Sequence, residues 1–272
     1  MQTQHMQQQQ LHHFVLVHGS CHGAWCWFKL AAKLKSDGQR VTAVELGGSG
    51  IDTRQHDQVR SVSEYLEPLM SFLESVPEDE KVVLVGHSYG GIGVSVAMEK
   101  FPTKISVGVF LSAYMPRHDS PPAALIQEYF KRLPEGFAMD CEFTFEEGPE
   151  QPPTSVMFGT SFLKKAYSNS QLEDLELAMA LVKPSWLYPK EMESEDLLTK
   201  ERYGSGKRVF IVCECDNVVP DEIQKWMISN YEPNEVKVIE EAGHMAMFTK
   251  PQQLSQLLQE IAATYDGIFF FG

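Results

Sequence analysis

Residues 81–91 read KVVLVGHSYGG, and this stretch decides the fold. A run of β-branched and aliphatic residues enters Gly-His-Ser-Tyr-Gly, and a helical pattern, IGVSVAMEK, follows it. A G-x-S-x-G sequence between a strand and a helix is typical of a nucleophile elbow, a sharp turn that lifts a serine hydroxyl clear of the sheet. The turn strains the backbone of Ser88, while Gly86 and Gly90 leave room for the chain to pass. We therefore predict that Ser88 is a nucleophile.

Apolar runs that resemble strands alternate with helical patterns on both sides of this stretch. Before it stand FVLVHG and RVTAVEL, each followed by a helical pattern, near residues 25–36 and 63–75. After it come ISVGVFLSAY, KRVFIVCEC and EVKVIEEAGH, and a last helical pattern, LSQLLQEIAATY. Strands joined by helical crossovers predict an α/β fold with a mostly parallel sheet and helices on both faces.

The alternation breaks between Tyr114 and Tyr203, where the chain is rich in Pro and Gly and holds two helical patterns, ALIQEYFKRL and SQLEDLELAMALV. We predict a single domain over residues 13–272 with an inserted cap at about 115–203, and a disordered polar tail over 1–12. Large apolar residues of the insertion either pack it onto the sheet or line a ligand site at the carboxyl ends of the strands. They are Phe130, Phe137, Phe143, Phe145, Met157, Phe158, Trp186 and Tyr188.

The composition excludes several classes of protein. The chain has 272 residues, 43% of them hydrophobic, and its 37 acidic against 23 basic residues give a formal charge of -14, which phosphate backbones and anionic lipids repel. No run is long and apolar enough for a membrane span, and the start has no secretory pattern, so we expect a cytoplasmic protein. Five cysteines with neither disulfide nor zinc spacing predict buried, reduced thiols and no metal. They are Cys21, Cys26, Cys141, Cys213 and Cys215.

A serine nucleophile needs a general base and an orienting carboxylate, in the chain order Ser, acid, His. His244 follows the last predicted strand, after a turn that begins at Gly243. The loop after VFIVC offers Glu214, Asp216 and Asp221. Asp216 fits best, because the carboxylate is needed just past the end of the strand, whereas Asp221 suits a helix start. Glu214 stays open as the alternative acid.

The oxyanion that develops on a substrate carbonyl needs preorganised N–H donors. One candidate is the backbone N–H of Tyr89, which directly follows the nucleophile. The other is the backbone N–H of Ser20, in the loop HGSCHGAW after the first strand. The need for a second donor favours this role over a plain strand-to-helix turn at that loop.

Several segments together resemble the plant methylesterase family of the α/β-hydrolase fold, over about residues 14–265. They are HFVLVHGSCHGAWCW, VTAVELGGSGID, KVVLVGHSYGG, KISVGVFLSAYMP and AGHMAMFTKPQQL. The family includes salicylate-binding esterases, methyl jasmonate and methyl indole-3-acetate esterases and hydroxynitrile lyases. The resemblance implies the catalytic residues already named and a substrate pocket near His22, Tyr89 and Tyr114. Relatives are often dimers, so a homodimer is kept as a hypothesis.

These observations predict a serine carboxylesterase without a cofactor. Its expected substrate is the methyl ester of a small apolar acid, with methyl jasmonate ahead of methyl salicylate and methyl indole-3-acetate. A ligand-binding receptor or carrier on the same scaffold is the alternative, because fold alone does not fix function. A hydroxynitrile lyase is disfavoured, because the resembled lyases carry Thr and Lys where this chain has Gly19 and Met245.

Overall fold

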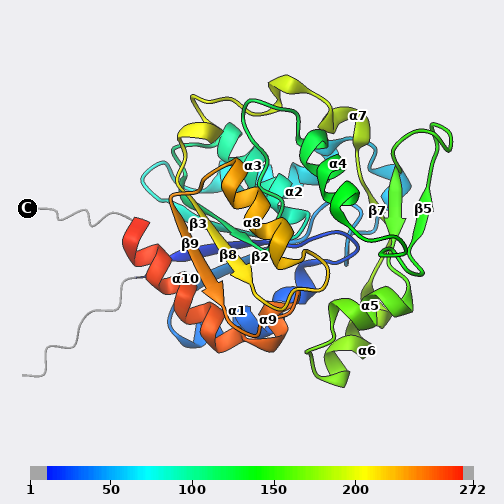
Figure 1. The fold of residues 1–272 in the computed structure, drawn as a ribbon. Helices are drawn as coiled ribbons and strands as arrows, with labels where there is room; N and C mark the ends of the chain where they lie inside the picture. The colour runs from blue at the N-terminus through cyan, green and yellow to red at the C-terminus, as the bar shows by residue number, and fades with distance from the viewer. Residues whose placement is uncertain (1–10, 266–272) are drawn as a thin grey trace, which may run out of the picture.

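The computed structural model describes residues 11–265, and its main feature is a sheet of six strands in the order β2-β1-β3-β4-β8-β9 (Figure 1). Every neighbouring pair in this sheet is parallel. The strands are β1 (His13–Val17), β2 (Arg40–Val44), β3 (Val82–His87), β4 (Ile105–Leu111), β8 (Arg208–Cys213) and β9 (Glu235–Ile239). The predicted α/β architecture is confirmed, and the described sheet is parallel throughout.

Burial follows the position of each strand in the sheet. All residues of the inner strands β1, β3, β4 and β8 are buried, because helices cover both faces of these strands. The edge strand β9 instead alternates, and it leaves Val236 and Val238 exposed. The longest unbroken apolar runs in the sequence therefore mark the centre of the sheet.

Helices cover the two faces of the sheet (Figure 1). On one face α1 (Phe28–Ser36) packs against α10 (Pro251–Tyr265). On the other, α2 (Val62–Ser75) packs on α3 (Gly90–Lys100), which lies along β3 and β4. The remaining helices of this layer structure are α8 (Asp221–Asn230) and the short α9 (Ala246–Thr249).

The segment between β4 and β8 forms the cap, which lies beyond one end of the main sheet in Figure 1. Its helices are α4 (Pro122–Arg132), α5 (Thr160–Ala166), α6 (Leu172–Leu181) and α7 (Pro189–Met192). A small antiparallel sheet joins β5 (Glu142–Thr144), β6 (Ser155–Met157) and β7 (Ser185–Trp186). Both predicted helices are present as α4 and α6. The sheet was not predicted, because strands of two or three residues carry too little periodicity.

Buried tyrosine hydroxyl groups tie the cap to the loops of the main domain. The pairs are Tyr89 with the Leu187 carbonyl (2.8 Å), Tyr129 with the Val218 carbonyl (2.7 Å), Tyr188 with the Val59 carbonyl (3.1 Å) and Tyr167 with the His22 ring (2.9 Å). A buried phenol needs a hydrogen-bond partner. These bonds therefore set where the cap sits over the carboxyl ends of the strands.

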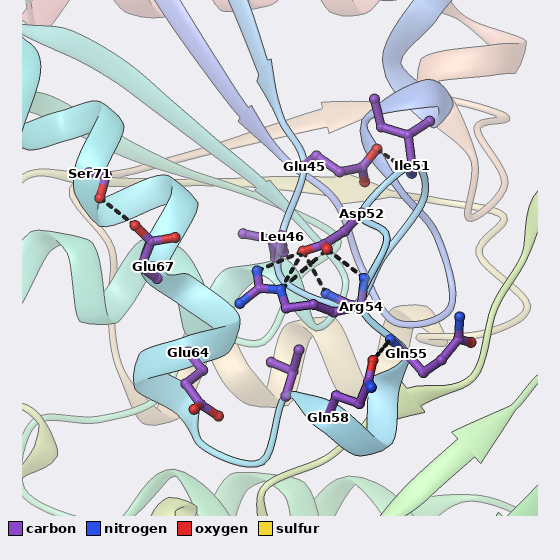
Figure 2. A network of polar contacts seen from close by, with 12 residues as sticks. Glu45, Leu46, Ile51, Asp52, Arg54, Gln55, Gln58, Glu64, Glu67 and Ser71 are labelled. Atoms are coloured by element: carbon purple, nitrogen blue, oxygen red, sulfur yellow. Dashed lines mark hydrogen bonds and ion pairs between the residues drawn. The ribbon is translucent and has the colours of Figure 1, made fainter.

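The loop after β2 is held by the polar network of Figure 2. Hydrogen bonds from Arg54, whose Nη2 lies 2.6 Å from Asp52 Oδ2, lower the pKa of the Asp52 carboxyl to about 2. Glu45 accepts hydrogen bonds from the backbone N–H of Ala24 (3.0 Å) and of Ile51 (3.2 Å). The Glu45 carboxylate thus joins the loop after β2 to the loop after β1.

Only the last two residues of the predicted tail, Leu11 and His12, belong to the described part of the chain. Residues 1–10 of the expected tail lie outside the described residues. His12, however, is buried, its backbone N–H donates to Gln39 Oε1 (2.8 Å), and its carbonyl accepts from the N–H of Arg40 (3.0 Å). The prediction of a tail over 1–12 is therefore wrong at His12, because its backbone already pairs with the start of β2.

The cysteines differ in burial. All five are free; three are buried, Cys141 is half-buried and Cys215 is exposed. The prediction of burial is wrong for Cys215, because β8 ends at Cys213 and Cys215 lies in the turn that follows. Within residues 11–265 no helix has the length and apolar character needed to cross a membrane.

Candidate active site

Ser88 stands directly after β3, at the carboxyl end of the sheet. Its φ of 54° places it in the left-handed region, which non-glycine residues seldom adopt. The Ser88 carbonyl accepts hydrogen bonds from the N–H groups of Gly91 (3.1 Å) and Tyr114 (2.9 Å), and these bonds hold the strained turn. The predicted sharp turn between strand and helix is therefore present.

Two glycines allow this turn to pack. A Cβ atom on Gly86 would lie 2.6 Å from Val94 Cγ2 of α3. A Cβ atom on Gly90 would lie 2.5 Å from the carbonyl oxygen of His18, in the loop after β1. Both distances are shorter than any real contact, so only glycine fits at either position, as predicted.

His244 lies after β9 and Asp216 lies after β8, and the structure joins their side chains. His244 Nδ1 is 2.7 Å from Asp216 Oδ2, and both residues are buried. A carboxylate only accepts hydrogen bonds, so Nδ1 carries the ring proton and Nε2 is left as a proton acceptor. Glu214 is exposed, and it accepts a hydrogen bond from the N–H of Glu241 (3.1 Å) instead. Of the two acids left open, Asp216 is therefore the one that contacts His244, and its catalytic role stays a prediction.

The Asp216 carboxylate has three further donors. Its Oδ1 accepts from the N–H groups of Val218 (2.6 Å) and Val219 (2.8 Å), and its Oδ2 accepts from Ser112 Oγ (2.6 Å). Ser112 is fully buried, with a φ of 39° in the turn after β4. Sequence reasoning missed Ser112, because a serine at the end of an apolar run gives no local signal for this contact.

A second histidine packs against the first. The His87 ring lies 4.4 Å from the His244 ring between centroids, and His87 Nε2 donates to the His244 carbonyl (2.9 Å). Burial, reinforced by the neighbouring His244, pushes the pKa of His87 well below its ordinary value, so this ring is neutral. His87 is the variable residue before Ser88 in the elbow, and it links the nucleophile turn to the backbone of His244.

The two predicted oxyanion donors are free to bind. Neither the Ser20 nor the Tyr89 backbone N–H has an acceptor within the part of the chain that the structure describes. The Gly19 carbonyl accepts from His18 Nδ1 (2.9 Å), and the Ser88 carbonyl is held as described above. In a trans peptide the N–H points away from the carbonyl, so holding each carbonyl directs the following N–H the opposite way.

An apolar cavity of about 530 Å³ opens at Ser88, beneath the cap. Ser20, Ser88, Tyr89 and Tyr114 line its floor, and Gln127 and Glu193 are among its few other polar residues. Six phenylalanines are among its apolar lining residues: Phe130, Phe137, Phe143, Phe145, Phe158 and Phe162. Most of the aromatic residues considered in the insertion therefore face a cavity. No lysine, arginine or histidine is among the described lining residues.

His22, which the resemblance placed at the pocket, is not among the residues that line this cavity, although its ring contacts Phe158, which is. The residue is buried outside the lining, with Nδ1 2.9 Å from the Ser20 carbonyl and Nε2 2.9 Å from Tyr167 Oη. Burial lowers the pKa of His22 to about 4. Both ring nitrogens already have protein partners, so the structure gives His22 a place behind the loop of Ser20. Tyr114 does line the cavity.

The site contains no recognisable metal centre within residues 11–265, because no group of three or more His, Cys, Asp or Glu side chains is arranged to hold an ion. The groups that the structure offers at this end of the sheet are a serine hydroxyl, an imidazole held by a buried carboxylate, and two backbone N–H groups.

Comparisons with known proteins agree with this geometry. The alpha/beta hydrolase family model matches residues 14–257. The chain is 84% identical over 267 residues to methylesterase 10 of Arabidopsis thaliana, covering 98% of this chain and 97% of that protein. It is 48% identical over 255 residues to methyl jasmonate esterase 1 of Vitis vinifera, covering 93% and 97%. The solved structure of polyneuridine aldehyde esterase aligns with a TM-score of 0.88 at 42% identity, covering 93% of this chain and 100% of that one.

Proposed function

The chain belongs to the plant methylesterase family of the α/β-hydrolase fold and is a carboxylic ester hydrolase, and from this premise we propose that it cleaves methyl esters of bulky apolar acids through an acyl-enzyme on Ser88. The observation that carries the proposal is the hydrogen-bonded Asp216–His244 pair, whose imidazole contacts the ring of His87 directly before Ser88, together with a strained Ser88 that lines an apolar cavity.

In the first step the Ser88 hydroxyl attacks the ester carbonyl while His244 Nε2 takes its proton. Asp216 holds the ring in the required tautomer and stabilises the imidazolium that forms. The negative charge that develops on the carbonyl oxygen is stabilised by the N–H groups of Ser20 and Tyr89. The intermediate collapses as His244 returns the proton to the leaving oxygen, which departs as methanol.

In the second step water replaces methanol. His244 takes a proton from this water, the resulting hydroxide attacks the acyl-enzyme carbonyl, and the same two N–H groups stabilise the second oxyanion. The C–O bond to Ser88 then breaks and the serine regains its proton. The products are the free acid and methanol.

The cavity supports an acid portion that is bulky and uncharged. Its phenylalanine lining offers apolar contact on all sides, and a volume of about 530 Å³ suits a ligand larger than a single benzene ring. A relative at 48% identity is named as a methyl jasmonate esterase, which supports the preference for methyl jasmonate over the smaller methyl salicylate.

The rival functions lack support in the cavity. A receptor that only binds a free acid needs neither a strained serine nor the hydrogen bond between Asp216 and His244, and this chain has both. A hydroxynitrile lyase needs a cation near the leaving cyanide, whereas the residue after His244 is Met245, an apolar side chain that is 1% exposed. Ester hydrolysis is therefore the chemistry that this site supports best.

The test is a panel of methyl esters of jasmonic, salicylic and indole-3-acetic acids, incubated with the wild type and with Ser88→Ala. We expect the wild type to release a free acid, with jasmonic acid released fastest. The variant should lose at least about 10⁴-fold in kcat while keeping its melting temperature. Binding of the free acids without hydrolysis of any ester would contradict the proposal and favour a receptor.

A further inference from the structure

The loop after β1 has consecutive carbonyl groups that each bind a donor from outside the cavity. The bonds run from His18 Nδ1 to Gly19 O (2.9 Å), from His22 Nδ1 to Ser20 O (2.9 Å) and from the Lys183 N–H to Cys21 O (3.0 Å). Ser20 lies between two held peptide groups, so its backbone has little freedom to rotate. His18 holds the peptide group that contains the Ser20 N–H, and His22 holds the next peptide group, so the two rings together fix the backbone on both sides of Ser20.

The Ser20 carbonyl sets the tautomer of His22, because a carbonyl can only accept a hydrogen bond. Because Nδ1 donates to the Ser20 carbonyl, a neutral ring accepts at Nε2, and the hydroxyl of Tyr167 is the donor at 2.9 Å. The ring is also fixed in direction, since it stacks on Trp25 at 5.2 Å and on Tyr167 at 6.0 Å between centroids. Without the Tyr167 hydroxyl, Nε2 loses its partner, and the ring is held less firmly in the position from which Nδ1 donates to the Ser20 carbonyl.

Tyr167 belongs to the cap, whereas Ser20 and His22 belong to the main domain. Tyr167 directly follows α5, and Phe162 of the same helix lines the cavity. The adjacent helix α6 is held to α1 by Asp174, whose Oδ1 lies 2.6 Å from Lys29 Nζ. The hydrogen bond from Tyr167 to His22 therefore couples the placement of α5 to the conformation of the Ser20 loop.

We propose that Tyr167 and His22 are positioning residues, which hold the Ser20 N–H in the direction of the oxyanion and complete this half of the oxyanion hole only while α5 is seated on the main domain. The inference rests on the proposed ester hydrolysis. It assigns to His22 a role in transition-state stabilisation through Ser20, and not a contact with the substrate.

Three variants of the full chain separate the two hydrogen bonds. An asparagine amide nitrogen occupies roughly the place of imidazole Nδ1, so His22→Asn keeps a donor for the Ser20 carbonyl. A glutamine amide reaches the place of Nε2, so His22→Gln loses that donor, and Tyr167→Phe removes the hydroxyl alone. We expect kcat to fall about 10- to 100-fold in His22→Gln and Tyr167→Phe, with KM within about twofold, and to recover largely in His22→Asn.

A second readout isolates the oxyanion hole. An octylthio trifluoromethyl ketone adds to the serine and leaves an oxyanion in the hole, so its inhibition constant should rise by the same factor as kcat falls. Tyr188→Phe is the matched control, because it removes another buried cap-to-core hydroxyl bond, to the Val59 carbonyl, far along the chain from the Ser20 loop. This control should keep both values within about twofold of wild type.

Other outcomes overturn the inference. An unchanged kcat in His22→Gln and Tyr167→Phe removes the positioning role. A rise in KM with an unchanged inhibition constant for the ketone would make His22 a substrate contact instead. Equal losses in Tyr167→Phe and Tyr188→Phe would indicate a general loosening of the cap. If the wild type hydrolyses no ester, the proposed function itself is wrong, and the positioning role is wrong with it.

Discussion

At Asp216, four donors converge on a single buried carboxylate. Two backbone N–H groups hold Oδ1, while Ser112 Oγ and His244 Nδ1 share Oδ2. Such a group is fixed in direction by its surroundings, so His244 has one orientation available to it. Sequence order alone left Glu214 open, and only the geometry of the two loops separates the two acids.

Asp216→Asn should lower kcat by about 10⁴-fold, because an amide at this position favours the wrong tautomer of His244. The matched control, Glu214→Gln, should stay within about twofold of wild type, because Glu214 bonds only the exposed turn at Glu241. Steady-state kinetics on the hydrolysed methyl ester compares the two variants. A larger loss in Glu214→Gln than in Asp216→Asn would reverse the assignment.

Ser112→Ala removes one of the two donors on Asp216 Oδ2. A buried hydrogen bond to a charged group contributes about 1.5–3 kcal/mol, so we expect a loss of that order in the free energy of unfolding and a drop of about tenfold in kcat. Ser106→Ala is the control, since Ser106 is a buried serine of β4, the strand that ends just before Ser112, and its hydroxyl donates to the Val82 carbonyl (3.0 Å). Urea denaturation and kcat are measured on both. An equal kcat in the two variants would show that Ser112 acts on stability alone.

At the scale of the element, helix α3 packs so closely on its neighbours that three of its first four residues are glycine: Gly90, Gly91 and Gly93. A Cβ atom on Gly91 would lie 2.1 Å from the Tyr114 carbonyl oxygen, which belongs to the chain leaving β4. A Cβ atom on Gly93 would meet side chains instead: Leu66 at 3.2 Å, Val17 at 3.4 Å and Leu69 at 3.8 Å. Two glycines of one helix thus differ in what surrounds them: backbone at the first position and side chains at the second.

Gly91→Ala should therefore destabilise the protein by about 1–3 kcal/mol or more, because a backbone segment beside the nucleophile must move. Gly93→Ala should be close to neutral, since the gain in helix propensity of about 1 kcal/mol offsets a small shift of Leu66. Chemical denaturation gives both free energies of unfolding. A cost for Gly93→Ala equal to that for Gly91→Ala would contradict the close approach to Tyr114.

At the scale of the whole molecule, buried neutral histidines link stability to pH. Burial lowers the pKa of His18, His22 and His87, and that of His22 falls from 6.5 to about 4. Between about pH 6.5 and pH 4 the unfolded chain therefore binds a proton at His22 that the folded chain does not bind. Stability is therefore complete above about pH 6.5 and is lost as the pH falls, with His22 contributing on the order of 3 kcal/mol by pH 4.

Thermal unfolding at pH 7.5 and pH 5.0, at constant ionic strength, tests this linkage. We expect a lower melting temperature at pH 5.0, where carboxylates with ordinary or lowered pKa values are still ionised and histidines dominate the change. His22→Asn should show a weaker dependence on pH than wild type, because one titrating group is gone. A melting temperature that stays constant or rises on acidification would contradict the neutral state of these rings.

Much of the architecture follows from local patterns that the chain carries by itself. Buried runs such as VVLVGH read as central parallel strands, because only a strand covered on both faces needs unbroken apolar residues. The elbow around Ser88 and the room left at Gly86 and Gly90 are also local, since the turn and the residues that permit it are neighbours. The order Ser, acid, His narrows the remaining choices without deciding them.

The tertiary structure alone decides which distant groups meet. It brings Ser112 to Asp216 across 104 positions and Tyr167 to His22 across 145 positions, and it keeps Glu214 away from His244. It also turns the phenylalanines of the cap toward a cavity. Spacing along the chain encodes how a segment folds locally, whereas these contacts depend on the placement of loops at the carboxyl ends of separate strands. The physical reason is that a side chain's hydrogen-bond partners are set by packing in three dimensions, which no single window of sequence contains.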